Sequence, residues 1–156
     1  MASVVDVQVS DDLNQVAQVL FLCWDKYAED GLDPNKTNIH QDERELWLDF
    51  LVDGELIGVC KVSPMQKHTV QVHPYLMYEH RFKFRSMCKA LLKFLVKLGS
   101  VQKVQAIIGM NHNYVIKAAM NVGLVVEGML SKSYFKNGEY HDQILLGITK
   151  EEVDRL

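Results

Sequence analysis

The sequence predicts a mixed α/β (α+β) domain, in which a mostly antiparallel sheet is flanked by helices. Two observations lead to this fold class. Runs with strand periodicity and runs with helix periodicity follow one another along the 156 residues. Asp53-Gly54 and Asn137-Gly138 each lie between two apolar runs, which is a strong sign of a β-hairpin. The length suits one hydrophobic core, so we expect a single domain over residues 1–156.

Strands are expected where apolar residues alternate with polar ones or run together over a short stretch. The first is the alternating run SVVDVQV, and a buried run, KVQAIIGM, precedes the last helix. The expected strand segments are residues 3–9, 46–65, 67–77, 103–110 and 124–148. The polar segment 32–45 reads as a loop between the first helix and the first hairpin.

Three helices are expected between these strands. Ser10 has the chemistry of an N-cap and two aspartates follow it, so the first helix should begin there and end at Gly31. The second helix covers residues 81–99, and the third covers 113–123 and ends at a glycine. The apolar face of the first helix consists of Leu13, Val16, Val19, Leu20 and Cys23.

The second helix, RFKFRSMCKALLKFLVKLG, carries a basic residue at every fourth position. Like charges at this spacing repel each other by about 0.2–0.5 kcal/mol per pair. This basic stripe consists of Arg81, Arg85, Lys89, Lys93 and Lys97. The opposite side, which we expect to be buried, consists of Met87, Cys88, Leu91, Leu92, Leu95 and Leu98.

The basic stripe lies in residues 80–126, which hold eight basic residues and no acidic one, in a chain of net charge −3. Such a region suits phosphate groups or an acidic surface, and a solvated outer face is the alternative interpretation. The expected partners are an acidic protein surface or a second copy of the chain, contacted through the basic helix. We expect no nucleic-acid partner, because the domain as a whole is acidic.

The C-terminal part of the sequence resembles the GNAT superfamily of acetyl-CoA-dependent N-acyltransferases. Residues 122–148, VGLVVEGMLSKSYFKNGEYHDQILLGI, are similar to the usual ending of that family. HPYLMYEHR followed by KALLKFL resembles the segment that joins its fourth strand to the pyrophosphate-binding helix. The resemblance implies a GNAT-like acyl-CoA N-acyltransferase fold over nearly the whole chain, with acetyl-CoA as the cofactor of an active member.

Two departures from the family pattern concern the chemistry. Active members place an Arg-x-x-Gly-x-Gly/Ala loop before the basic helix, because glycine lets a phosphate approach the backbone N–H groups of a helix N-terminus. This chain has no glycine between Gly58 and Gly99, and Phe84 lies at or near a glycine position in either alignment. The tyrosine that protonates the leaving thiolate in many members aligns with Ala119, and Leu124 stands where phenylalanine is usual.

For an active site, the resemblance implies roles for a small set of residues. His73 or Glu79 would act as the base, and His73 also has the alternative interpretation of a structural strand-end histidine. The expected cofactor-binding residues, which would hold the phosphates and the pantetheine, are Lys83, Arg85, Ser86, Met87, Cys88, Asn111 and Asn113. We expect no metal site and three reduced thiols, because the six histidines and three cysteines show no metal-ligand spacing.

Two functions remain open from the sequence. The first is a GNAT-fold protein with a degenerate acetyl-CoA site, which serves as a non-catalytic binding or structural module and needs no cofactor. The run AEDGLDP before an acidic loop and the glycine-free basic helix resemble GNAT-like small proteins of tailed phages, so this hypothesis includes a phage virion or assembly protein. The second is an active N-acetyltransferase that acts on a small-molecule or protein amine. With no apolar run of membrane-spanning length and no secretory signal in the sequence, we expect a cytoplasmic protein, or one incorporated into a phage particle.

Overall fold

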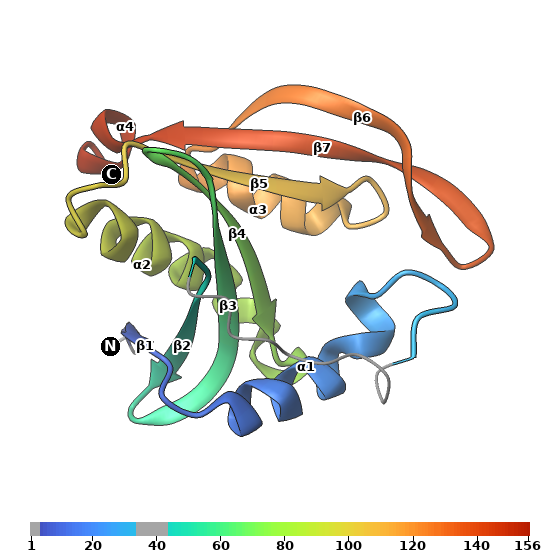
Figure 1. The fold of residues 1–156 in the computed structure, drawn as a ribbon, viewed down its shortest axis with the longest axis horizontal. Coiled ribbons are helices and arrows are strands. Elements are labelled where there is room, and N and C mark those ends of the chain that lie inside the picture. The colour runs from blue at the N-terminus through green and yellow to red at the C-terminus, as the bar shows by residue number, and fades with distance from the viewer. Residues whose placement is uncertain (1–3, 34–43) are drawn as a thin grey trace.

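The computed structural model describes residues 4–33 and 44–156, and its centre is one seven-stranded sheet in the order β1-β2-β3-β4-β5-β7-β6 (Figure 1). All neighbouring strands are antiparallel except β4 and β5. The strands are β1 (Val5–Val9), β2 (Leu46–Val52), β3 (Glu55–Gln66), β4 (Thr69–Leu76), β5 (Lys103–Gly109), β6 (Val125–Lys136) and β7 (Glu139–Thr149). The mixed α/β class and the mostly antiparallel sheet are confirmed.

Helices cover both faces of this sheet. The alternation along β2 places Trp47 in a cluster with α1 and Leu48 in the larger core with α2 and α3. None of the described helices is long and apolar enough to cross a membrane. The helices are α1 (Leu13–Tyr27), the 3-10 helix η2 (Tyr78–Lys83), α2 (Phe84–Lys97), α3 (Asn113–Val122) and α4 (Lys150–Asp154).

Both predicted hairpin turns are confirmed. Asp53 and Gly54 have φ angles of 51° and 79°, and Asn137 and Gly138 have φ angles of 54° and 76°. Two successive positive φ angles are what a two-residue turn needs to match the twist of its strands. Asparagine, aspartate and glycine adopt them at low cost, which is why the sequence signal was reliable here.

The predicted helix boundaries were less accurate. The N-cap of α1 is Asp12 rather than Ser10, because the Asp12 carboxylate accepts hydrogen bonds from two backbone N–H groups of the first turn. The helix ends at Tyr27, before Gly31. The α-helical part of the basic segment begins only at Phe84, and Leu98, expected to be buried, is 50 % exposed.

Two further segments differ from expectation. The short helix α4 was not predicted, although Thr149 and Glu152 form a capping box that is visible in the sequence as TKEE. The expected loop 32–45 lies mostly outside the described residues.

The only parallel pairing in the described sheet, between β4 and β5, is short. β4 and β5 pair over three positions, from Thr69–Lys103 to Gln71–Gln105. Beyond Gln71 the two strands continue separately, and Figure 1 shows β3 and β4 running down the picture while β5 and β7 run across it. The sheet therefore opens into two arms, with a space between the carboxyl-terminal halves of β4 and β5.

The end of α1 connects the two arms. The Tyr134 hydroxyl of β6 donates a hydrogen bond to the Tyr27 carbonyl at 2.8 Å. The N–H of Asp30 donates to the Phe135 carbonyl at 3.0 Å, and the Asp30 carboxylate accepts from the N–H of Gly138 at 2.8 Å. Backbone N–H groups of the hairpin turn hold the pKa of Asp30 below its ordinary value. We call these contacts the α1–hairpin bridge.

The close approach of β3 and β4 beside the opening gives a stability prediction. A Cβ added at Gly58 would lie 2.5 Å from the Tyr75 carbonyl oxygen and 3.1 Å from Leu76. We expect Gly58→Ala to lower the free energy of unfolding by about 1–3 kcal/mol, as overpacking does. The matched control is Gly128→Ala, since nothing lies within 4 Å of a Cβ at that position. Urea unfolding of both variants is the measurement, and equal stability of the two would contradict the expectation.

Candidate functional site

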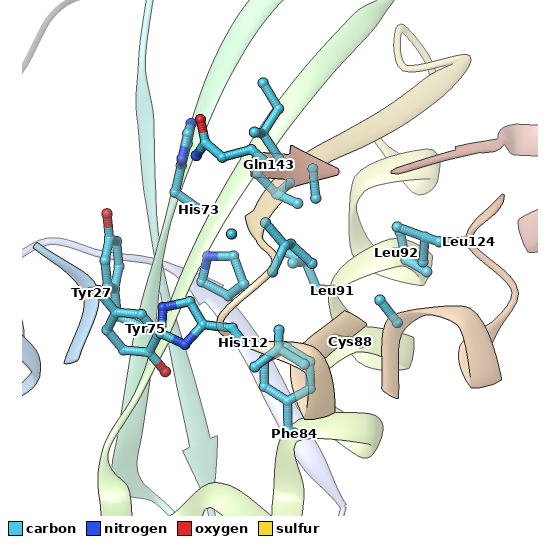
Figure 2. Close-up of a pocket in the computed structure, with 18 of the residues that line it drawn as sticks. Tyr27, His73, Tyr75, Phe84, Cys88, Leu91, Leu92, His112, Leu124 and Gln143 are labelled. Carbon is cyan, nitrogen blue, oxygen red and sulfur yellow. The ribbon is translucent and has the colours of Figure 1, made fainter. Parts of the chain in front are cut away.

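A cavity of about 210 Å³ lies where β4 and β5 diverge (Figure 2). We call it the splay cavity. β4 contributes His73, Pro74 and Tyr75 to its walls, β5 contributes the segment 106–109, and α2 and α3 close its other sides. A concave, mostly apolar pocket with a few polar groups is typical of a ligand site.

A second cavity, of about 480 Å³, lies on the α1 side of the sheet. We call it the outer cavity. Glu29, Glu45 and Lys61 are among its lining residues, and Lys61 pairs with Glu45 at 3.1 Å. Four residues line both cavities, and they are Tyr27, Tyr75, Tyr134 and Gln143. The two cavities therefore share one wall.

His73, predicted as a base, does line the splay cavity. Burial is the main cause that lowers its pKa below 6.5, and the Lys61 ammonium adds to this, while Glu45 opposes it. Its Nε2 lies 3.2 Å from the Gln71 amide nitrogen, and the Gln71 amide oxygen accepts from Gln105 at 3.1 Å. Because the Gln71 oxygen is already used, its NH₂ group donates to Nε2, which leaves the His73 proton on Nδ1.

A histidine that the sequence reading did not select lies on the opposite wall. His112 precedes α3, and its ring lies 5.8 Å from that of Tyr27 and 6.3 Å from that of Tyr134. Burial and then the positive charges of Lys26 and Lys136 lower its pKa. The sequence predicted a role for Asn111 and Asn113, on either side of this histidine, and none for His112 itself.

The shared wall is aromatic and uncharged. The rings of Tyr27 and Tyr75 meet edge to face with centroids 5.5 Å apart. Burial raises the pKa of Tyr75 to about 12 and raises that of Tyr27 further, so both hydroxyls stay protonated at neutral pH. The wall can donate hydrogen bonds to a ligand, and it offers no charge to balance an ionic one.

The predicted phosphate-binding residues fall into two groups. Arg85 and Ser86 are exposed on the first turn of α2, next to the half-buried Lys83. Met87 and Cys88 are buried in the core, and burial raises the pKa of the Cys88 thiol to about 12. Their side chains therefore cannot reach a phosphate at the surface, and only their backbone could serve.

The start of α2 follows directly on η2. The N–H of Phe84 donates to the Arg81 carbonyl, because η2 runs directly into the helix. The Phe84 ring is 8 % exposed and lines the splay cavity. The guanidinium of Arg81 stacks on the Tyr78 ring at 4.1 Å and donates to the Tyr78 carbonyl.

Three other candidates lie apart from the two cavities. Glu79 is exposed on η2, and Asn111 and Asn113 are exposed at the start of α3. None of the three is among the residues that line either cavity. Ala119, which aligns with the tyrosine of the resembling family, is buried on α3 and does line the splay cavity.

The lowered pKa values predict a pH dependence of stability. The unfolded chain binds protons more readily at His73 and His112 than the folded protein does. The free energy of unfolding should therefore fall as the pH drops below about 6.5. We expect His73→Gln to lose less stability than the wild type between about pH 7.5 and about pH 5, measured by urea unfolding. His68→Gln, at an exposed position, is the control. The same pH dependence in the wild type and His73→Gln would contradict the assignment.

Comparison with known proteins gives a likeness of structure. No protein-family model and no curated protein sequence matches the chain. A chimera of the Vibrio cholerae spermidine N-acetyltransferase SpeG and hSSAT superposes with a TM-score of 0.81 at 16 % identity, over 99 % of this chain and 100 % of that one.

Two more solved structures agree. The spermidine N-acetyltransferase from Vibrio cholerae in complex with CoA and spermine gives a TM-score of 0.77 at 14 % identity, over 96 % of this chain and 97 % of that one. A probable acetyltransferase gives a TM-score of 0.73 at 13 % identity, over 97 % of this chain and 96 % of that one. The chain therefore has the GNAT acyltransferase fold, as the resemblance in its sequence implied.

Proposed function

We propose that this protein uses the GNAT fold as a non-catalytic binding module, in which the acetyl-CoA site has degenerated. The observation that carries the proposal is the start of α2, where η2 runs directly into the helix at Phe84 and no glycine is present. A place in a phage particle stays a prediction from the sequence alone.

One backbone N–H group at the start of α2 already has a partner. A helix N-terminus binds anions through backbone N–H groups that have no partner within the helix. Here the N–H of Phe84 already donates to Arg81, and the Arg81 guanidinium is stacked on Tyr78. The buried Phe84 side chain also lines the splay cavity. These contacts favour a helix start that no longer admits a pyrophosphate.

The proton-transfer groups support the same proposal. A general base needs a free lone pair within reach of the proton that it takes. The Nε2 lone pair of His73 is held by Gln71, and Glu79 lies on the surface away from the cavities. Ala119 has no proton to give to a leaving thiolate.

The basic stripe provides a surface for a partner. Arg85, Lys89, Lys93 and Lys97 are all exposed, and within the described part of the chain no ion pair involves them. A row of unpaired cations attracts a surface of opposite charge. We therefore propose an acidic protein surface as the partner, with self-association as the alternative.

An active N-acetyltransferase is the second candidate, and the two adjoining cavities favour it. The splay cavity would hold the thioester, and the outer cavity, with Glu29 and Glu45, would hold an amine. A solved structure with this fold contains CoA and spermine, so a polyamine is the first acceptor to assay. The amine would attack the thioester directly, and His73 or Glu79 would accept its proton, in the latter case through water.

Binding of acetyl-CoA separates the two candidates. A ligand at 100 times its dissociation constant adds about 2.7 kcal/mol to stability, which raises the Tm of a domain of this size by roughly 5–10 °C. We expect no saturable rise of Tm with acetyl-CoA, and none with dephospho-CoA or ATP as controls. A saturable rise specific to acetyl-CoA would overturn the degenerate site and justify an assay with amines.

The basic stripe predicts a gain in stability from a charge reversal. Lys89 lies between Arg85 and Lys93 on one helix face, so Lys89→Glu turns two repulsive pairs into attractive ones. We expect the free energy of unfolding to rise by about 0.8–2 kcal/mol, since each of the two pairs changes sign. The control is Lys117→Glu on α3, which has no charged residue four positions away and should change stability by less than about 0.5 kcal/mol.

The same variants test the partner surface. Poly-L-glutamate should bind the wild type in a salt-dependent way and should bind Lys89→Glu more weakly, while Lys117→Glu binds like the wild type. Two results would contradict the proposal that the basic stripe binds an acidic partner. One is a loss of stability in Lys89→Glu, and the other is equal binding of poly-L-glutamate by all three proteins. Tighter binding to duplex DNA than to poly-L-glutamate would point to nucleic acid instead.

A further inference from the structure

The splay cavity is polar at one end and apolar at the other. Figure 2 shows Tyr27, His73 and Tyr75 on the left of the cavity and Leu92 and Leu124 on the right. The apolar end lies between α2, α3 and the sheet, and its side chains are all less than a tenth exposed. Such a gradient suits a ligand with an apolar chain and a polar head.

The size of the cavity sets the length of that chain. An engineered apolar cavity of about 150 Å³ binds benzene, which has six carbon atoms. By proportion, a cavity of about 210 Å³ holds about eight carbon atoms. An acetyl group would leave most of it empty, and the walls of an empty cavity lose dispersion contacts.

α3 contributes one small side chain to the lining of the cavity. Ala119 is buried on α3 and lines the cavity, while Val115, Ile116 and Val122, the other buried residues of this helix, are all larger. Leucine at position 119 would add three carbon atoms to a side chain that lines the cavity, so it would take up space that the alanine leaves free.

The polar end selects an uncharged head. Among the described residues that line the splay cavity there is no aspartate, glutamate, lysine or arginine. Its two histidines are held neutral by burial, and its tyrosines are protonated. An ion would lose its hydration there without gaining a counter-charge. A carbonyl group can accept a hydrogen bond from the NH₂ group of the Gln143 amide.

We infer that the splay cavity binds a medium-chain acyl group of about eight carbons, presented as an uncharged thioester, ester or amide. This inference rests on the proposed function in one respect, since it treats the cavity as a binding site that works without the phosphates of CoA. The acyl group would be the ligand of the module, and the basic stripe would take no part in binding it.

The probe is S-octanoyl-N-acetylcysteamine, a thioester that has no phosphate. We expect saturable binding by calorimetry, at least about a hundredfold tighter than that of S-acetyl-N-acetylcysteamine, because each added methylene is buried in the apolar end. Octanoate, which has the same chain on a charged head, should bind more weakly than the octanoyl thioester. Equal affinity for the acetyl and octanoyl thioesters, or no binding of either, would overturn the inference.

Two variants locate the binding. Ala119→Leu fills the apolar end and should abolish octanoyl binding, while Ala17→Leu, the same change at a half-buried position of α1 outside the cavity, should bind like the wild type. Leu124→Phe enlarges a different residue of the same end and serves if Ala119→Leu does not fold. If Ala119→Leu or Leu124→Phe folds and still binds the octanoyl thioester, the ligand binds outside the splay cavity.

The outcomes for the two proposals are distinguishable. Binding of acetyl-CoA would overturn the degenerate cofactor site, whatever the octanoyl thioester does. If neither the octanoyl thioester nor acetyl-CoA binds, the inference about the acyl chain is overturned and the proposal of a non-catalytic module stands.

Discussion

The short parallel pairing of β4 with β5 is the constraint on which the rest of the structure depends. Three residue pairs join the two arms of the sheet, and the strands then separate. A parallel connection needs a crossover, and α2 provides it by burying its apolar side between the arms. Longer pairing would remove the splay cavity, and the α1–hairpin bridge keeps the arms together where the ladder has ended. The bridge joins Tyr27 to Tyr134 and Asp30 to the final hairpin.

Much of the fold could be predicted because its signals are local. The turns at Asp53-Gly54 and Asn137-Gly138 depend on the φ angles of two residues, and the end of α3 at Gly123 depends on one positive φ of 129°. The starts of helices were harder to predict from the sequence. Ser10 and Asp12 both have N-cap chemistry, and only the path of the chain between β1 and α1 decides between them. The 3-10 turn before α2 likewise has no pattern of its own in the sequence.

The candidate site could be predicted only in part. His73 follows from its position near the end of a strand, which the resemblance already placed at the opening. The roles of Gln143, Tyr134 and Tyr27 in the shared wall depend on contacts between residues that lie far apart in sequence. No spacing rule brings the end of α1 to the final hairpin, so these residues had no signal beyond their aromatic or amide chemistry. His112 did have a signal in the sequence, because it is a polar residue between a buried strand and a helix.

In the proposed function, this GNAT fold keeps the opening between β4 and β5 but not a phosphate-binding start of the following helix. Heteronuclear NMR of the backbone amides from Phe84 to Cys88 during a titration with CoA tests this most directly, since these N–H groups would contact a bound pyrophosphate. We expect the signals of these amides not to move as CoA is added. Saturable shifts confined to these amides would contradict this expectation, because they would show a working phosphate site at the start of α2.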